Sequence, residues 1–158
     1  MLKKLIFPIL LCLSTTGFSQ NTYKMLVGTY TRGTTSEGIY SLEINKQGQL
    51  IFNKLLAKSD NPSYLAFSPY GKYVYAVNEL GEESTVSAFA FDKENETLTF
   101  LNKVSAGGAD PCFITVSDRH VFTANYSSGS ISVFERHPDG TISEAVQVIT
   151  HPKKNLGN

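Results

Sequence analysis

The sequence predicts an all-β fold built from repeated units of four strands. Segment 61–79 alternates apolar and aromatic residues on both sides of a tight turn at Pro69-Tyr70-Gly71. Alternation of this kind, bounded by proline and glycine, is typical of a half-buried β-hairpin. A second copy begins at Asp110, 49 residues after the first begins, and ends at Asn125. Other matched positions recur after 45 to 47 residues, which predicts one structural unit per forty-odd residues.

Four strands in forty-odd residues is the size of one blade of a β-propeller, and a β-sandwich or a barrel is the alternative. Turn-forming residues separate the expected strands, which alternate in side-chain character. We expect the strands at 25–30, 39–44, 50–57, 63–68, 72–78, 85–91, 98–104, 112–117, 120–125, 130–135 and 142–149. No segment combines helical periodicity with capping residues, so no helix is predicted.

The first of the three expected blades lacks its innermost strand, because segment 25–57 supplies only three strands. In a complete ring that strand would come from the C-terminal end. Propellers have about four to eight blades, so three blades do not close a ring. We therefore expect residues 20–158 to be the N-terminal part of a longer, truncated propeller domain.

The first 19 residues have the pattern of a signal peptide. Lys3 and Lys4 precede an apolar run at 5–13 that is too short to span a bilayer. Gly17 and Ser19 place small residues before a cleavage site. We expect an exported protein, periplasmic or extracellular, without a membrane anchor.

Composition excludes several other classes of function. The formal net charge is zero, and there is no basic stripe of the kind that binds nucleic acid or an anionic membrane. Beyond the leader, Cys112 is the one cysteine, so no intrachain disulfide is expected, and we predict that it is buried and inert. The three histidines are well separated in sequence, so no metal site is expected.

Six short motifs resemble the bacterial lactonase family of seven-bladed propellers, which includes the propeller-type 6-phosphogluconolactonases and the carboxymuconate-cyclising enzymes. They occur in family order, at 28–31, 36–40, 61–65, 98–101, 110–112 and 124–129. The resemblance implies seven blades in the complete ring and hydrolysis or closure of a lactone ring without a cofactor. It also implies that the catalytic residues, a histidine with arginine and glutamate partners, lie beyond Asn158, so none is assigned here.

Blade geometry predicts where a binding site would form. With four antiparallel strands to a blade, the connections after the second and fourth strands emerge on one face of the ring. Loops held by a rigid sheet are where binding residues concentrate. The substrate-binding candidates at these connections are Glu79, Asn125, Tyr126, Tyr30 and His151.

Each candidate has a simpler alternative role. Glu79 either binds sugar hydroxyls or orients a water, or it accepts backbone N–H groups of the next loop. Asn125 either contacts a ligand or ties a loop to its own backbone. Tyr126 and Tyr30 either line a pocket or fill the core, and His151 is either a site residue or a solvated side chain.

The expected function is hydrolysis of a sugar lactone by attack of water on the ring ester carbonyl, as in a 6-phosphogluconolactonase. The partner would be a small-molecule lactone or sugar acid, and export argues against a phosphorylated substrate made in the cytoplasm. The alternative is a non-catalytic exported propeller that binds carbohydrate or protein at its central mouth. On either reading we expect this segment by itself to be inactive and prone to aggregation, because its blade edges are open.

Overall fold

The computed structural model describes residues 22–152; the predicted leader lies outside this range. Within it, each strand agrees with its predicted range to within two residues at either end. A single 3-10 turn, η1 (Pro69–Gly71), occupies the predicted turn. The strands are β1 (Tyr23–Gly28), β2 (Gly38–Ile44), β3 (Leu50–Lys58), β4 (Tyr64–Phe67), β5 (Tyr73–Asn78), β6 (Thr85–Asp92), β7 (Thr97–Ser105), β8 (Pro111–Val116), β9 (His120–Asn125), β10 (Ser130–Arg136) and β11 (Ile142–Thr150).

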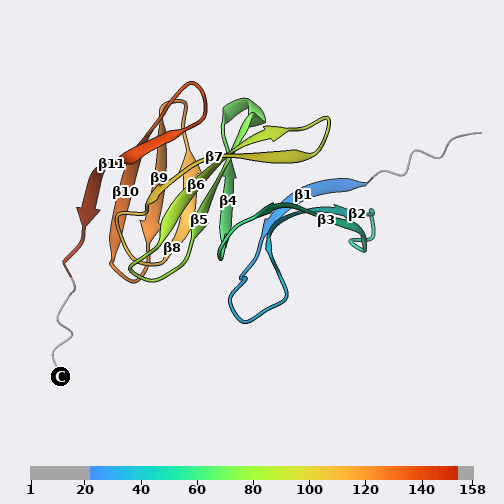
Figure 1. The fold of residues 1–158 in the computed structure, drawn as a ribbon, viewed down its shortest axis with the longest axis horizontal. Helices are drawn as coiled ribbons and strands as arrows, with labels where there is room; N and C mark the ends of the chain where they lie inside the picture. The colour runs from blue at the N-terminus through green and yellow to red at the C-terminus, as the bar shows by residue number, and fades with distance from the viewer. Residues whose placement is uncertain (1–21, 153–158) are drawn as a thin grey trace, which may run out of the picture.

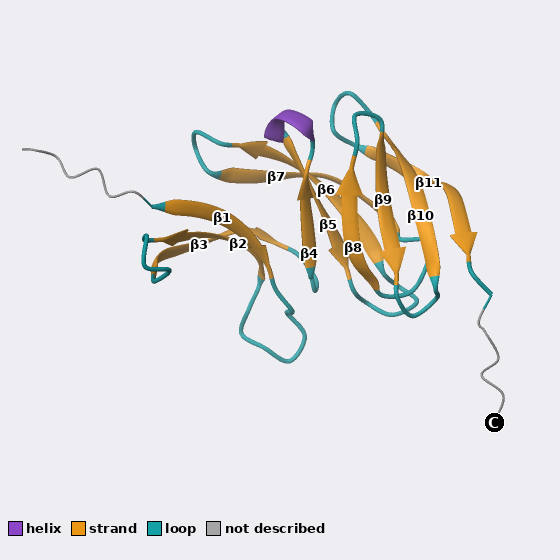
Figure 2. Ribbon diagram, turned by 180° about the vertical axis from the view of Figure 1, so that it is seen from behind, coloured by secondary structure: helices purple, strands orange, loops and turns teal. Residues whose placement is uncertain are grey.

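The strands form three antiparallel sheets that stand side by side (Figures 1 and 2). Blade 1 has the order β1-β2-β3, blade 2 the order β4-β5-β6-β7, and blade 3 the order β8-β9-β10-β11. Within each blade, every strand pairs with the next one in the chain, so each blade is a simple meander. The prediction of propeller blades, with the first one lacking its innermost strand, is confirmed.

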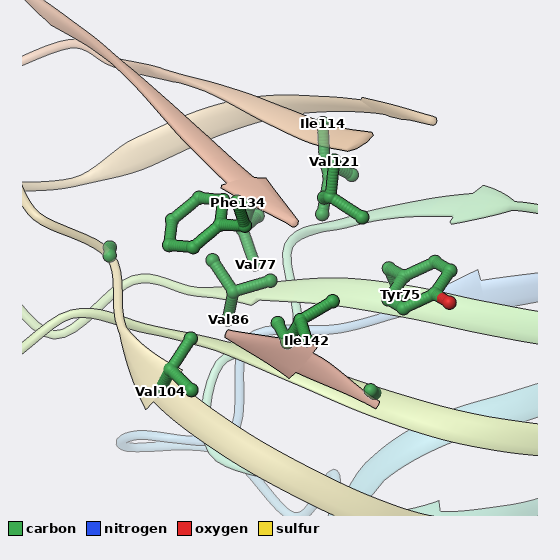
Figure 3. Packing of buried hydrophobic residues seen from close by; sticks show 10 residues of the cluster. Tyr75, Val77, Val86, Val104, Ile114, Val121, Phe134 and Ile142 are labelled. Atoms are coloured by element: carbon green, nitrogen blue, oxygen red, sulfur yellow. The ribbon is translucent and has the colours of Figure 1, made fainter. Parts of the chain in front are cut away.

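The hydrophobic core lies between the blades. One cluster fills the space between blades 2 and 3 (Figure 3), and it consists of Tyr75, Val77, Val86, Ala88, Val104, Ala106, Ile114, Val121, Phe134 and Ile142. A second cluster between blades 1 and 2 consists of Ile39, Val74, Ala76, Phe89 and Leu98. Strand β5 contributes alternate residues to both clusters, which explains why its apolar run is continuous. Burying each such Val, Ile or Phe side chain contributes roughly 1.5–3 kcal/mol.

Hydrogen bonds between blades 2 and 3 fix the face opposite the candidate site. The Tyr73 and Tyr75 hydroxyls donate to the carbonyls of Pro138 and Gly140, each at 3.0 Å. Burial is the main cause that raises the pKa of Tyr75 to about 12. Gly140 has a φ of 89°, and any Cβ there would overlap the Tyr73 ring. This turn therefore requires glycine.

The prediction that Cys112 is buried is wrong. Its side chain is exposed, and its thiol lies 3.7 Å from the Ala124 carbonyl oxygen, to which it donates. The pairing of β8 with β9 shifts in register between Pro111 and Phe113, so Cys112 occupies a bulge at the start of the innermost strand. A regular register would not have produced this exposure. Across residues 22–152, no helix has the length and hydrophobicity to cross a membrane.

Candidate binding site at the loop face

The connections after the second and fourth strands of the blades lie on one side of the molecule, as predicted. Figure 1 shows these loops along the lower edge of the ribbon, while η1 and the β10–β11 turn lie at the upper edge. Two residues with positive φ, Asn61 and Asp110, stand at matching places in the connections that enter blades 2 and 3. Each is followed by proline and each joins two blades through its side chain.

Asn61 joins blades 1 and 2. Its φ of 40° lies in the left-handed region, which asparagine tolerates better than most residues. Its Oδ1 accepts hydrogen bonds from the backbone N–H of Thr31, at 2.9 Å, and of Arg32, at 3.1 Å. Its Nδ2 donates to the Glu79 carbonyl oxygen at 2.8 Å, and the Glu79 N–H donates to the Asn61 carbonyl oxygen at 3.1 Å. Asn61 thus fixes the β1–β2 loop against the end of β5.

Asp110 repeats this arrangement between blades 2 and 3, with a φ of 51°. Its Oδ1 accepts the Gly81 N–H at 2.9 Å, and its Oδ2 accepts the Ser127 hydroxyl at 2.6 Å. The Tyr126 N–H donates to the Asp110 carbonyl oxygen at 2.9 Å. The two junctions therefore use the same backbone geometry with different side-chain charge.

Three side chains from two blades meet at the first junction, and we call them the Glu79 cluster: Tyr30, Ser63 and Glu79. The Tyr30 hydroxyl donates to Glu79 Oε2, and the Ser63 hydroxyl donates to Oε1. The hydrogen bond to Glu79 is the main cause that raises the pKa of Tyr30 to about 12, followed by desolvation and by the charges of Glu79 and Asp110. Tyr30 remains 54% exposed. The structure thus brings two of the predicted site residues into direct contact.

Asn78 is buried at the end of β5, directly before Glu79. Its Nδ2 donates to the Ser59 hydroxyl at 2.8 Å and to the Asp60 carbonyl at 2.6 Å, and its Oδ1 accepts from the Ser87 hydroxyl at 2.7 Å. The amide therefore ties the connection between blades 1 and 2 to blade 2.

Asn125 occupies the matching position at the end of β9 and is equally buried. Its Nδ2 donates to the hydroxyls of Ser130, at 3.0 Å, and Ser132, at 2.9 Å, while its Oδ1 accepts from Thr123 at 3.2 Å. These bonds all lie within blade 3. The Asn125 amide therefore joins β9 to β10, and contact with a ligand stays a prediction.

The other two candidates are bonded to residues outside the Glu79 cluster. Tyr126 follows Asn125 as Glu79 follows Asn78, and it is 81% exposed beside Asp110. His151 is exposed next to the β9–β10 loop, where its N–H donates to the Gly129 carbonyl at 3.0 Å. Their roles as binding residues stay predictions.

Ser63 was missed by the sequence reasoning, as were two aromatic rings at the inner edge of the blades. Tyr64 and Phe113 stand at matching positions in β4 and β8, with ring centroids 5.3 Å apart. The register of the β4–β5 hairpin, in which Tyr64 faces Val77, places Ser63 opposite Asn78, one residue before Glu79. The sequence alone left that register open.

A pocket of about 240 Å³ lies between blades 1 and 2, and the two neighbours of Glu79 in the chain, Asn78 and Leu80, line it. Its lining is mixed, with polar residues such as Asn78, Ser87 and Lys103 beside the apolar side chains of Leu80, Phe89 and Phe100. Within residues 22–152, no three His, Cys, Asp or Glu side chains are grouped as metal ligands would be.

Comparison with known proteins agrees with this architecture. The family model described as lactonase, 7-bladed beta-propeller, matches residues 24–158. The chain belongs to this lactonase family. A 6-phosphogluconolactonase of Bacillus subtilis is 38% identical over 131 residues, which cover 81% of this chain and 37% of that protein.

Two solved structures extend the comparison. A candidate 6-phosphogluconolactonase from Bacteroides fragilis is 44% identical with a TM-score of 0.77, covering 87% of this chain and 40% of that one. The periplasmic gluconolactonase of Pseudomonas aeruginosa is 32% identical with a TM-score of 0.74, covering 82% and 39%. This lactonase-family chain therefore spans roughly two fifths of the length of the proteins it matches.

Proposed function

We propose that this chain is part of an exported enzyme that hydrolyses a sugar lactone by attack of water on the ring ester carbonyl. The observation that carries the proposal is the family match over residues 24–158, joined to a polar loop face of the kind that holds binding residues in such folds. The names of the relatives from B. subtilis and P. aeruginosa support the substrate class. The periplasmic location of the P. aeruginosa protein supports export.

In this proposal the described blades bind the substrate and do not carry out proton transfer. Hydrolysis of an ester needs a base near the attacking water and a donor near the developing oxyanion. Both carboxylate oxygens of Glu79 already accept hydrogen bonds, from Tyr30 and Ser63. Glu79 is therefore suited to holding other groups in place, and we assign proton transfer to blades other than these three.

The test uses a ring-completed protein, in which residues 24–158 replace the segment of the B. fragilis protein that they match. We expect it to release acid from glucono-1,5-lactone faster than buffer does, measured in a pH-stat. The unaltered B. fragilis protein and the 158-residue chain alone are the controls, and we expect no activity from the latter. A folded ring-completed protein with no rate above buffer on this lactone or its 6-phosphate would overturn the proposal.

A further inference from the structure

The direction of the hydrogen bonds in the Glu79 cluster determines whether the cluster offers a ligand hydrogen-bond donors or acceptors. The Tyr30 and Ser63 hydroxyls both donate their protons to the Glu79 carboxylate. The unused bonding capacity of the cluster therefore consists of lone pairs on the phenol, hydroxyl and carboxylate oxygens. Such a group of acceptors binds ligands that present hydroxyl donors, and Tyr30 is open to solvent.

Charge at the same place disfavours an anionic ligand. The carboxylates of Glu79 and Asp110 both raise the pKa of Tyr30, so both act at the position of its hydroxyl. Asp110 is held there by Gly81 and Ser127. The two salt bridges found among the described residues, Lys24–Glu96 and Lys58–Glu37, leave both of these carboxylates without a paired cation. A phosphate dianion placed here would be repelled over several ångströms.

Hydrogen bonds of Asn61 hold the backbone on both sides of the Glu79 cluster, which favours selective binding of one ligand over another. Asn61 bonds the loop that carries Tyr30 and, through the Glu79 carbonyl, the strand end that carries Glu79. The Asn61 amide thus fixes the backbone on both sides of the cluster, and the bonds to the Glu79 carboxylate hold the Tyr30 and Ser63 hydroxyls. Preorganised polar groups of this kind give specificity for a matching pattern of hydroxyls.

We propose that the Glu79 cluster is a subsite for the hydroxyl groups of an unphosphorylated sugar lactone, and that its charge selects against a phosphate at this position. The inference rests on the proposed function for the identity of the ligand. It assigns Glu79 and Tyr30 to substrate specificity rather than to the chemical step.

The test compares three substrates of the ring-completed protein: glucono-1,5-lactone, its 6-phosphate and δ-valerolactone, which has no hydroxyl groups. Glu79→Gln should raise KM for glucono-1,5-lactone about tenfold, as expected for loss of a hydrogen bond to a charged group, with kcat changed far less. Its kcat/KM for δ-valerolactone should change by a much smaller factor, because that lactone has no hydroxyl group for the cluster to bind. In Glu79→Gln the ratio of kcat/KM for glucono-1,5-lactone to that for its 6-phosphate should fall. This fall should be smaller in high salt, because salt screens the charge of Glu79.

Glu83→Gln is the matched control, since it removes an exposed carboxylate from the neighbouring β5–β6 loop and leaves the cluster intact. Glu83→Gln should leave KM for glucono-1,5-lactone, kcat/KM for δ-valerolactone and the preference for the unphosphorylated lactone unchanged. Tyr30→Phe should raise KM for glucono-1,5-lactone in the same direction as Glu79→Gln. The inference is overturned if Glu79→Gln changes kcat/KM by the same factor for all three substrates, or changes it for none of them.

A separate binding experiment distinguishes failure of this inference from failure of the proposed function. If the ring-completed protein hydrolyses no lactone, binding of glucitol is measured by saturation-transfer NMR. Binding that is lost in Glu79→Gln and kept in Glu83→Gln supports a hydroxyl subsite in a non-catalytic protein. No glucitol binding to the unsubstituted protein overturns the subsite.

Discussion

Blades 2 and 3 place different side chains on nearly the same frame. In blade 2, Asn78 is followed by Glu79, and in blade 3 Asn125 is followed by Tyr126. Ser63 bonds Glu79 at the start of the inner strand of blade 2, whereas Cys112 occupies that place in blade 3.

By the frame we mean the residues at matching places in the two blades whose side chains form hydrogen bonds with other groups of the protein. Asn78 and Asn125 are both buried, and Asn61 and Asp110 both adopt positive φ and bond the loop of the preceding blade. Apart from Asn61 and Asp110 themselves, the residues that differ between the blades lie toward the surface beside this frame. A repeated frame thus lets each blade carry its own polar groups at little cost to folding.

The largest expected effect comes from removing the buried amides. We expect Asn78→Ala to lower the free energy of unfolding of the ring-completed protein by about 3 kcal/mol and Asn125→Ala by about 2 kcal/mol, since each leaves buried polar partners unsatisfied. The loss of stability should be larger for Asn78→Ala because Asn78 also holds the connection from blade 1. Urea unfolding measures both, and an equal or reversed order would show that the amides do not differ in this way.

Exchanging the charges of the two junctions should have a smaller effect. Asn61→Asp loses the Nδ2 donor to the Glu79 carbonyl and adds a negative charge beside Glu79, so we expect a loss of about 1–2 kcal/mol. Asp110→Asn keeps one acceptor oxygen and the positive φ, so about 0.5–1 kcal/mol is expected. The same urea experiment applies, and Asp110→Asn proving the costlier change would contradict this assignment.

The pH dependence should test the hydrogen bond between Tyr30 and Glu79. Its pKa is raised from 10.0 to about 12, so the stability due to its bond with Glu79 is fully present below pH 10 and is lost as the pH rises toward 12. Ultraviolet titration of tyrosinate should therefore show one late-titrating group fewer in Tyr30→Phe than in the unsubstituted protein. Tyr75 also titrates late, because it is buried, and it should remain in both. Identical titration curves above pH 10 would contradict the bond.

The smallest effect is expected from giving blade 3 the side chains of blade 2. The double substitution Cys112→Ser and Tyr126→Glu changes two exposed residues on an unchanged frame, so stability should shift by less than about 0.5 kcal/mol. Thermal unfolding measures the shift. A large loss would show that the two frames are not equivalent. As a control, Cys112 of the unsubstituted protein should react readily with a thiol reagent under native conditions.

The sequence by itself determined the strands, the turns and the division into blades. Alternation along each strand and the Gly, Pro and Asn residues between strands are local signals, and the 49-residue repeat fixed the blade size. The loop face and the connections that lie on it also followed, because the direction of successive antiparallel strands sets the side on which each connection emerges.

Only the tertiary structure decided which side chains meet. Tyr30 and Glu79 are 49 positions apart and belong to different blades, so their contact depends on how the sheets pack and on the bonds of Asn61. The exposure of Cys112 depends on a bulge in the register of β8. Period-two patterns specify which face of a strand is apolar, but they do not encode register shifts or the distance between neighbouring sheets.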